Sequence, residues 1–154
     1  MTVKAEHFCI QEYVPPHIFF TRGERAWELI DSRLIETNDA LRERFGPMII
    51  NTWHSPTLIR AFGLREWSGL RIASYYKTEN GTGHDMYRRY DQSLSQHKYG
   101  RASDSLFRDV TGQEVREYVL ANPFEFPHLT ALEDRTTWFH GDVRNCEPVK
   151  VFRG

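Results

Sequence analysis

The chain has 154 residues, of which 40% are hydrophobic and 14% aromatic, and this is enough apolar material for the core of one domain. Its formal net charge of -1 provides no overall attraction to nucleic acid or to an anionic membrane surface. No stretch approaches the roughly 18 apolar residues of a membrane span, and the first residues lack the apolar run of a signal peptide. We therefore expect a protein made in the cytoplasm, with no nucleic acid among its partners and no membrane span.

The two cysteines, Cys9 and Cys146, lie near opposite ends of the sequence. Their separation is unlike the short spacings between the cysteine ligands of zinc sites. We interpret them as free thiols, and a disulfide that joins the two ends of the chain is the alternative.

The first third of the sequence predicts an extended segment followed by one long helix. Residues 1–23 contain two adjacent prolines, so we expect them to run extended and to pack as a lid. Thr21 and Glu24 have the spacing of a capping box, and apolar residues then recur at helical intervals until a Gly-Pro pair. This pattern predicts a helix over 24–45.

The middle of the sequence has weaker patterns. Residues 48–53 form a short apolar run that is typical of a buried strand, and residues 57–66 are expected to contain a helical turn. Residues 67–96 are rich in Tyr, Gly, Asn and Arg without apolar periodicity, which predicts a long surface loop. A loop of this length inside a small domain usually has a function.

The last part of the chain, 97–154, is expected to form the core that carries the chemistry. A strand is predicted over 102–107, and a second, shorter helix begins after Thr111 and ends before Pro123. Three antiparallel strands should follow, at about 128–133, 136–143 and 148–152, with Asp134-Arg135 as a tight turn between the first two. The sequence therefore predicts a single α+β domain over 1–154, in which a small antiparallel sheet packs against both helices.

Three residues in this last part have the types and spacing of metal ligands. His97 and Asp104 are seven positions apart with Gly100 between them, so a turn and a short strand can bring both to one ion. His140 lies in another predicted strand, and period-two alternation allows neighbouring strands to direct their side chains to one point. Two His and one Asp leave a tetrahedral zinc one open position, which is typical of a catalytic site. The alternative is that they are ordinary polar residues near the core.

These residues also carry a resemblance to a known family. Ser95, His97, Gly100, Ala102 and Asp104 fill the pattern S-x-H-x-x-G-x-A-x-D, and Trp138, His140 and Asp142 fill W-x-H-x-D. In both motifs the chain resembles the zinc D,D-peptidases and L,D-peptidases of the M15 type, above all the small M15 proteins of tailed phages. That family cleaves peptidoglycan stem peptides and shares a metal site with the Hedgehog signalling domain. The resemblance implies a zinc ion held by His97, Asp104 and His140.

The resemblance also suggests roles for residues around the metal. Arg71 resembles an arginine that positions the substrate or stabilises the developing oxyanion, and an arginine suits this because its charge is fixed and its donors fork. A surface arginine without such a role is the alternative. Asp142 could orient a ligand histidine, or it could instead form an ion pair with Arg144 at the surface. We expect Ser95 to bond locally and so to support the turn that carries His97.

The chain departs from the family at the general base. Many members have an acidic residue three positions before the last histidine ligand, where this chain has Thr137. In the Hedgehog-type arrangement the acid lies further upstream, which makes Glu133 and Asp134 the nearest candidates, with Glu133 preferred. Such a carboxylate would take the proton of the attacking water and pass it to the leaving amine. A zinc domain without this base would bind and not cut.

From these observations we expect a zinc peptidase that acts on bacterial cell-wall peptides. As a phage protein it would be made in the host cytoplasm, and it would act at the cell wall either as a lysin or as a part of the virion. The alternative is a non-catalytic structural or wall-binding virion protein of the tail that keeps the same fold. The expected partners are peptidoglycan peptides and, for a virion part, phage tail proteins.

Overall fold

The described residues form a five-stranded sheet, and four of its strands lie in the C-terminal half of the chain. In the computed structural model, which describes residues 2–145 and 149–153, the strands are β1 (Met48–Ile49), β2 (Ala102–Phe107), β3 (Ala131–Asp134), β4 (Phe139–Asp142) and β5 (Lys150–Arg153). Their order in the sheet is β1-β2-β4-β3-β5. The first three pairings are antiparallel, whereas β5 runs parallel to β3, so the prediction of an antiparallel last strand is wrong.

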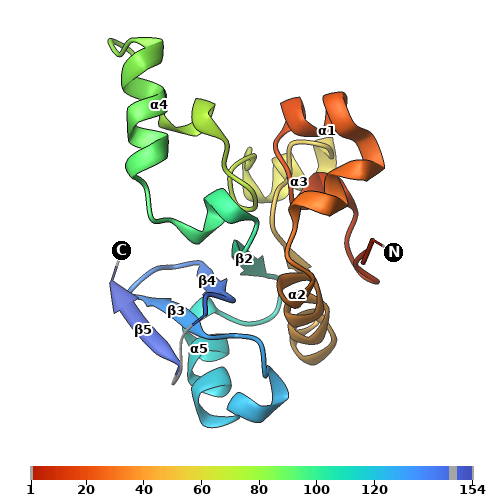
Figure 1. Ribbon diagram of the computed structural model, residues 1–154. Helices are drawn as coiled ribbons and strands as arrows, with labels where there is room; N and C mark the ends of the chain where they lie inside the picture. Colours follow the sequence, from red (N-terminus) through yellow and green to blue (C-terminus); the bar gives the residue numbers. More distant parts are fainter. Residues whose placement is uncertain (1, 146–148, 154) are drawn as a thin grey trace.

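The described residues also form five α-helices and several short 3-10 helices. The α-helices are α1 (Pro16–Arg22), α2 (Ser32–Phe45), α3 (Pro56–Phe62), α4 (Gly83–Gln92) and α5 (Gly112–Ala121). The 3-10 helices are η1 (Ile10–Glu12), η2 (Gly23–Leu29), η3 (Ala73–Tyr76), η4 (Gln96–Tyr99) and η5 (Pro123–Glu125). Helix α2 contacts β2, and α5 contacts both β2 and β4. Helix α4 has no buried residue and projects from the body of the protein (Figure 1). The α+β class and the single domain are therefore confirmed.

The long helix predicted over 24–45 is divided in two. The chain forms η2 first, becomes extended at Ile30, and starts again as α2 after Asp31. The Asp31 carboxylate accepts the backbone N–H of Arg33 at 3.0 Å, which makes it the N-cap of α2. The apolar periodicity continues across the break. For this reason the periodicity did not reveal that a second helix starts after Asp31. Thr21 forms no capping box either, because its hydroxyl donates to the carbonyl of His17 within α1.

Two segments predicted without helices contain them. The segment 1–23 is not extended throughout, since Pro16 starts α1, where a proline suits the first turn because its missing N–H has no acceptor there. The predicted loop 67–96 contains η3 and α4. Thr82 and Asp85 form a capping box at the start of α4. The spacing of these two residues is visible in the sequence, but glycines lie on both sides of Thr82 and favour a loop.

The C-terminal elements follow the prediction more closely. Strand β2 has the predicted bounds, and α5 begins with the predicted capping box of Thr111 and Glu114. The helical turn expected within 57–66 is α3, and only two residues of the run 48–53 form a strand. No tight turn joins β3 to β4, because four residues separate the strands and Arg135 has a φ of 62°. Cys146, and residue 148 of the last predicted strand, lie outside the described residues.

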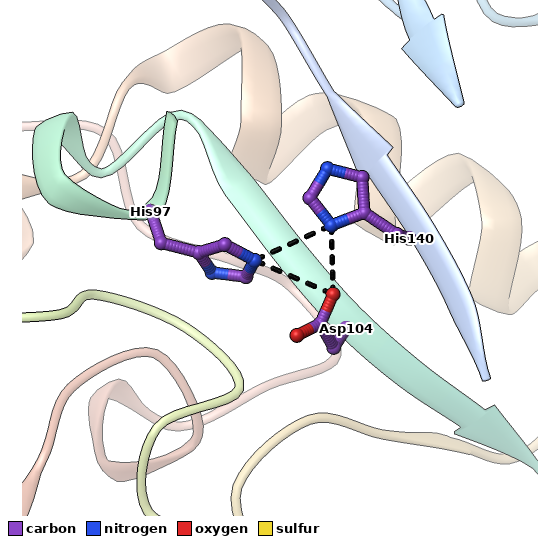
Figure 2. A group of neighbouring side chains, drawn as sticks. All are labelled: His97, Asp104 and His140. Atoms are coloured by element: carbon purple, nitrogen blue, oxygen red, sulfur yellow. Dashed lines mark hydrogen bonds and ion pairs between the residues drawn. The ribbon is translucent and has the colours of Figure 1, made fainter. Parts of the chain in front are cut away.

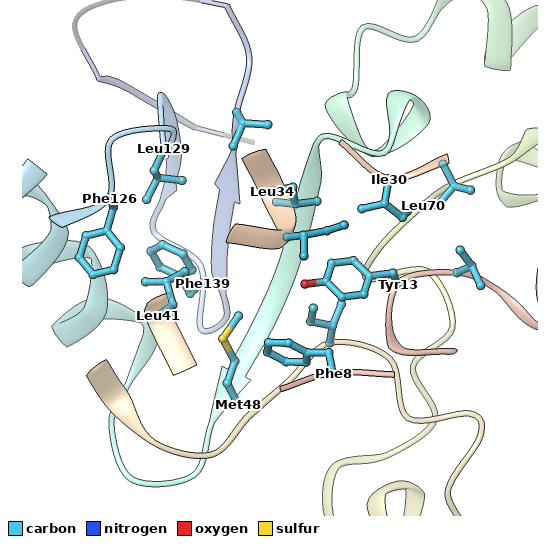
Figure 3. Packing of buried hydrophobic residues seen from close by; sticks show 14 of the residues in the cluster. Phe8, Tyr13, Ile30, Leu34, Leu41, Met48, Leu70, Phe126, Leu129 and Phe139 are labelled. Carbon is cyan, nitrogen blue, oxygen red and sulfur yellow. The ribbon is translucent and has the colours of Figure 1, made fainter. Parts of the chain in front are cut away.

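The hydrophobic core joins the N-terminal segment to the sheet (Figure 3). Its centre is Tyr13, which is fully buried, packs against Phe8 and Trp27, and accepts a hydrogen bond from Asn38 at 3.1 Å. The Tyr13 carbonyl accepts the backbone N–H of Leu70 at 2.7 Å. The core therefore holds the segment 67–71 in place beside β2. In the described part of the chain, every helix is too short or too polar to cross a lipid bilayer.

Candidate metal centre

The three predicted metal ligands meet in a buried group, which we call the triad: His97 on η4, Asp104 on β2 and His140 on β4. His140 Nδ1 lies 2.7 Å from Asp104 Oδ1, and His97 Nε2 lies 3.3 Å from each of these two atoms. Figure 2 shows the three atoms at the corners of a small triangle. The side chains are only 3%, 12% and 6% exposed, in chain order. The triad could therefore hold a metal ion.

The strand register explains why the ligands converge. Asp104 pairs directly with His140 across β2 and β4, so the two side chains share one face of the sheet. His97 reaches them from η4, which ends at Gly100 in the left-handed conformation with a φ of 65°. A side chain at position 100 would come within 2.0 Å of the Leu29 carbonyl oxygen. Glycine is required there for both reasons.

Hydrogen bonds to the second nitrogen of each imidazole turn the ligand atoms toward the centre of the triad. His97 Nδ1 donates to the Gly69 carbonyl at 2.8 Å, which leaves the lone pair of Nε2 facing Asp104. His140 Nε2 lies 3.1 Å from Asp142 Oδ2, which leaves Nδ1 facing the other ligands. Such partners fix the tautomer and the orientation of metal-binding histidines. The predicted role of Asp142 thus agrees with its position.

Asp142 also pairs with Arg144, but it is buried, so this ion pair is not the surface contact that was the alternative. The guanidinium of Arg144 donates to the two Asp142 oxygens at 2.7 and 2.6 Å, and Asp142 is fully buried. Its pKa is lowered, since the ion pair with Arg144 and the contact with His140 outweigh the effect of burial. A charged Asp142 is therefore available to accept from His140.

The ionisation of the triad favours a cation at its centre. Burial opposes the charged form of Asp104, but the two imidazoles hold its pKa well below the usual range. Burial lowers the pKa of His97. Burial would also lower the pKa of His140, yet its bonds to Asp104 and Asp142 raise that pKa to about 9. Without a metal, a proton on His140 compensates the Asp104 charge, and a metal would replace that proton.

The donor set fits zinc. Two ligand atoms that each lie about 2.0–2.1 Å from a tetrahedral zinc are roughly 3.3 Å apart. The two separations that involve His97 have this value, and the separation between Asp104 and His140 is shorter at 2.7 Å. Imidazole and carboxylate are common zinc ligands, and three of them leave one position open. A small shift of the Asp104 carboxylate would complete the geometry.

The segment 67–71 supports the triad through both its backbone and Arg71. The Ser68 carbonyl accepts the N–H of Asp104 at 2.8 Å, and the Arg71 N–H donates to the His97 carbonyl at 3.1 Å. The Arg71 side chain donates to Asp104 Oδ2 and to the Trp67 carbonyl, each at 2.8 Å. Arg71 therefore lies at the site, as predicted, but its bonds orient the ligand carboxylate.

The two candidate bases lie in different places. Glu133 follows Leu132, which pairs with Gly141, so it lies beside His140 on the face of the sheet that carries the triad. Glu133 Oε2 is 3.9 Å from His140 Nδ1. Asp134 is on the opposite face, where its carboxylate accepts the N–H of Arg135. The structure thus brings Glu133 to the site and leaves Asp134 outside it.

Ser95 bonds locally in the turn that carries His97, as expected, and does so through its backbone. Its carbonyl, and not its hydroxyl, accepts the N–H of Lys98 at 3.2 Å in the first turn of η4. Its side chain forms no capping bond and borders the cavity described next.

A cavity of about 450 Å³ opens over the triad. Its lining comes from both ends of the segment 71–97 and from the strands of the sheet and their flanking residues. The lining residues are Arg71, Tyr75, Leu94, Ser95, Gln96, His97, Asp104, Glu133, Trp138, His140, Arg144 and Phe152. This size suits a short stretch of peptide or a similar small ligand. The open side of the triad and the Glu133 carboxylate therefore face the same space.

Sequence reasoning missed Gly69. A Cβ atom at this position would lie 2.2 Å from the Tyr13 carbonyl oxygen, so only glycine allows the segment to approach the core. The same residue supplies the carbonyl that orients His97. A glycine two positions before Arg71 indicates that another part of the backbone could lie close to it, but the sequence does not show which part.

Comparisons of this chain with protein-family models, with curated proteins and with solved structures find no match. The assignment of function therefore depends on the geometry of the site and on the motifs in the sequence.

Proposed function

We propose that the protein is a zinc peptidase that cleaves peptides of the bacterial cell wall. The observation that carries the proposal is the convergence of three buried ligand atoms beside a carboxylate in one open cavity. The ligand set has the composition of a catalytic zinc site, with two histidines, one carboxylate and room for a substrate. Perturbed ionisable groups grouped in a cavity are typical of active sites.

Each residue at the site has a role in this proposal. A bound zinc ion would polarise the scissile carbonyl and lower the pKa of a water molecule. Glu133 accepts the proton of the attacking water and returns it to the leaving amine, since its carboxylate faces the open side of the triad. Arg71 holds the Asp104 carboxylate in its ligand orientation, and its charge near the scissile carbonyl favours the developing oxyanion.

The cell-wall substrate and the phage origin rest on the sequence motifs. The patterns around His97 and His140 resemble those of the small M15 proteins of tailed phages. As a lysin, the protein would reach the wall from the host cytoplasm, where it is made. As a virion part, it would be bound to tail proteins and would open the wall at entry.

A second candidate is a non-catalytic wall-binding or structural virion protein. The observation in its favour is Thr137, an exposed residue that stands where many members of the resembled family have their catalytic acid. If Glu133 does not act as the base, the same site would bind a peptide without cutting it.

The test is a metal analysis combined with hydrolysis of purified peptidoglycan. The peptidase proposal expects one zinc ion per chain, and peptide fragments, identified by mass spectrometry, that disappear with a chelator and return with added zinc. Zinc binding without any fragment across several wall types would refute the peptidase and support the binding protein. Absence of bound zinc would refute the metal site itself.

A further inference from the structure

Two phenylalanine side chains are largely exposed and lie at opposite ends of the molecule. Phe20 on α1 is 77% exposed, and Phe124 on η5 is 96% exposed. Figure 1 shows α1 beside α3 at one end, and α5, which directly precedes η5, at the other. A phenylalanine ring in water contributes little to the stability of the fold, so a partner that covers it would gain the full free energy of its burial.

Phe20 belongs to an aromatic surface that joins α1 to the start of α3. The rings of Phe19, Phe20 and Trp53 contact one another, with centroids 5.8 to 5.9 Å apart. Trp53 precedes α3, and its indole N–H donates to the Val14 carbonyl at 2.9 Å. Trp53 and Phe19 therefore hold the Phe20 ring in a fixed place at the surface.

Helices α1 and α3 carry only positive charges. The segments 13–23 and 46–65, which contain the two helices, have no Asp or Glu. Arg22, Arg25 and Arg60 are exposed, and none of them forms an ion pair within the described part of the chain. Arg22 and Arg25 also border a hollow of about 500 Å³. We use the name basic face for these three arginines together with Phe19, Phe20 and Trp53.

Phe124 belongs to a second surface, which α5 and η5 form together. Leu120 on α5 is four positions before Phe124 and is also exposed. Glu117 and Glu125 flank this apolar pair in the sequence, and both are exposed. We use the name acidic knob for Glu117, Leu120, Phe124 and Glu125.

The negative charge of this second surface is only partly compensated. Residues 112–126 contain three glutamates and one arginine, Arg116, which is buried. Glu117 accepts from the Gln113 side chain, and Glu125 accepts from the Tyr118 hydroxyl, so both bond to uncharged groups. One cation from α2, Arg44, lies over the Tyr118 ring. The surface of α5 and η5 therefore keeps a net negative charge.

We propose that the acidic knob of one chain docks on the basic face of a second copy of this chain. Each surface combines an exposed aromatic ring with charged side chains of one sign, and the two signs are opposite. The rings would supply most of the binding free energy, and the charges would favour this contact over contacts between identical surfaces.

The positions of the two surfaces determine the type of assembly. They are different surfaces at opposite ends of the molecule, so the contact is heterologous and adds copies head to tail. Both surfaces are small, and small interfaces are typical of weak association that depends on protein concentration. The contact involves neither the triad nor its cavity, so it is independent of the proposed peptidase activity.

Sedimentation equilibrium of the purified full chain measures this association. The average mass should increase with protein concentration past the mass of a dimer, because each added copy presents a new free surface. The association should weaken when sodium chloride is raised from about 0.05 M to about 0.5 M, because salt screens the charges of both surfaces.

One substitution in each surface tests which residues form the contact. Phe124→Asp disrupts the acidic knob and Phe20→Asp disrupts the basic face, and each should weaken the association about 30-fold or more. Both rings are exposed, so the fold should tolerate either change. The matched control is Leu94→Asp, which replaces an 86% exposed leucine outside both surfaces and should associate like the wild type.

A mixture of the two variants tests the head-to-tail arrangement. Phe124→Asp keeps an intact basic face, and Phe20→Asp keeps an intact acidic knob. An equimolar mixture should therefore form a 1:1 complex that grows no further, although each variant alone stays monomeric at the same concentration. A contact between two identical surfaces would instead leave one of the two variants dimeric by itself.

Four results would overturn the inference. They are a wild type that stays monomeric at about 1 mM, association that neither variant weakens, one variant that remains dimeric alone, and a mixture that forms no 1:1 complex. A monomeric wild type that binds poly-L-glutamate through Arg22 and Arg25 would also overturn it, because the basic face would then have an acidic partner other than this chain.

Discussion

The described residues contain two groups of side chains that could bind a metal, and the groups differ in what surrounds them. One is the triad, and the other is a surface group made of Glu6, His7 and Glu43. In the surface group His7 Nε2 lies 3.2 Å from Glu43 Oε1, a distance close to those within the triad. These two side chains are 35% and 62% exposed, however, and water screens their interaction.

The comparison shows that two groups with similar ligand types and distances can differ in the contacts that hold their side chains. In the triad, the Gly69 carbonyl and the Asp142 carboxylate hold both imidazoles, and Arg71 holds the Asp104 carboxylate. Among the described residues, the His7 ring has no comparable support, since it contacts Glu43, a member of the same group. Ordering a flexible surface group around an ion costs conformational entropy that a supported triad has already lost in folding.

The largest expected effect follows from removal of a triad ligand. His97→Ala, Asp104→Ala and His140→Ala should each lose the bound zinc, because three protein ligands leave no substitute. The variant His7→Ala is the matched control and should keep it. The measurement is zinc content after exhaustive dialysis. Full zinc in all three triad variants, or zinc loss in His7→Ala, would reverse the assignment of the two groups.

The next effect separates metal binding from catalysis at the same cavity. Glu133→Gln keeps the side-chain volume and removes the base, so turnover should fall about 10²- to 10⁴-fold with zinc retained. Asp134→Asn is the matched control, because Asp134 lies on the opposite face of the sheet and should change turnover little. The assay is release of peptidoglycan fragments at equal zinc occupancy. Equal activity of Glu133→Gln and wild type would exclude Glu133 as the base.

The support of the triad by the core can be broken at one glycine. Gly69→Ala forces a Cβ atom against the Tyr13 carbonyl, and overpacking of this kind costs about 1–3 kcal/mol of unfolding free energy. The shift should also move the Gly69 carbonyl away from His97 and weaken zinc binding. Gly83→Ala is the control, since a Cβ atom there has nothing within 4 Å. Chemical denaturation of both variants, without and with zinc, measures the two effects. A Gly69→Ala protein as stable as Gly83→Ala would contradict the proposed close packing.

A milder change tests the orientation of one imidazole. Asp142→Asn keeps the volume of the side chain but removes the charge that His140 and Arg144 share. Loss of such a partner typically weakens metal affinity about 10- to 100-fold. Competition with a chromophoric chelator gives the zinc affinity directly. An unchanged affinity would mean that the His140 ring is held by its packing against Phe152 instead.

The parts of the structure that the sequence predicted well are those with local signals. The capping box at Thr111 and Glu114 predicted α5, and the pattern from Ser95 to Asp104 predicted the turn and strand that carry two members of the triad. The motif glycine, Gly100, is explained by its left-handed backbone and by the nearby Leu29 carbonyl. Local chemistry determines these elements, so one sequence is enough to find them.

The parts that the sequence did not predict depend on contacts between distant segments. The role of Gly69 requires both the Tyr13 carbonyl and the His97 imidazole, neither of which is near it in the chain. The choice between Glu133 and Asp134 depended on the register of β3 against β4. A shift of one residue would have reversed that choice, because alternate side chains point to opposite faces. The parallel pairing of β5 with β3 left no local signal either.

The last effect concerns Glu12, a buried carboxyl that forms no ion pair within the described part of the chain. Glu12 is bonded to the backbone N–H and the thiol of Cys9, and burial raises its pKa from 4.5 to about 7. As pH rises above 4.5, the unfolded chain releases this proton first, so the folded state loses stability between pH 4.5 and 7. The loss should be about 2 kcal/mol between pH 5 and pH 7.

Glu12→Gln removes this titration and isolates it from all others. The difference in unfolding free energy between wild type and variant, measured by urea denaturation at several pH values, should change in favour of the variant as pH rises. Asp104 and Asp142 behave oppositely, because their charged partners lower their pKa values. Parallel stability curves for wild type and Glu12→Gln would show that Glu12 has an ordinary pKa in the folded protein. Burial without an ion pair would then not raise the pKa of this carboxyl.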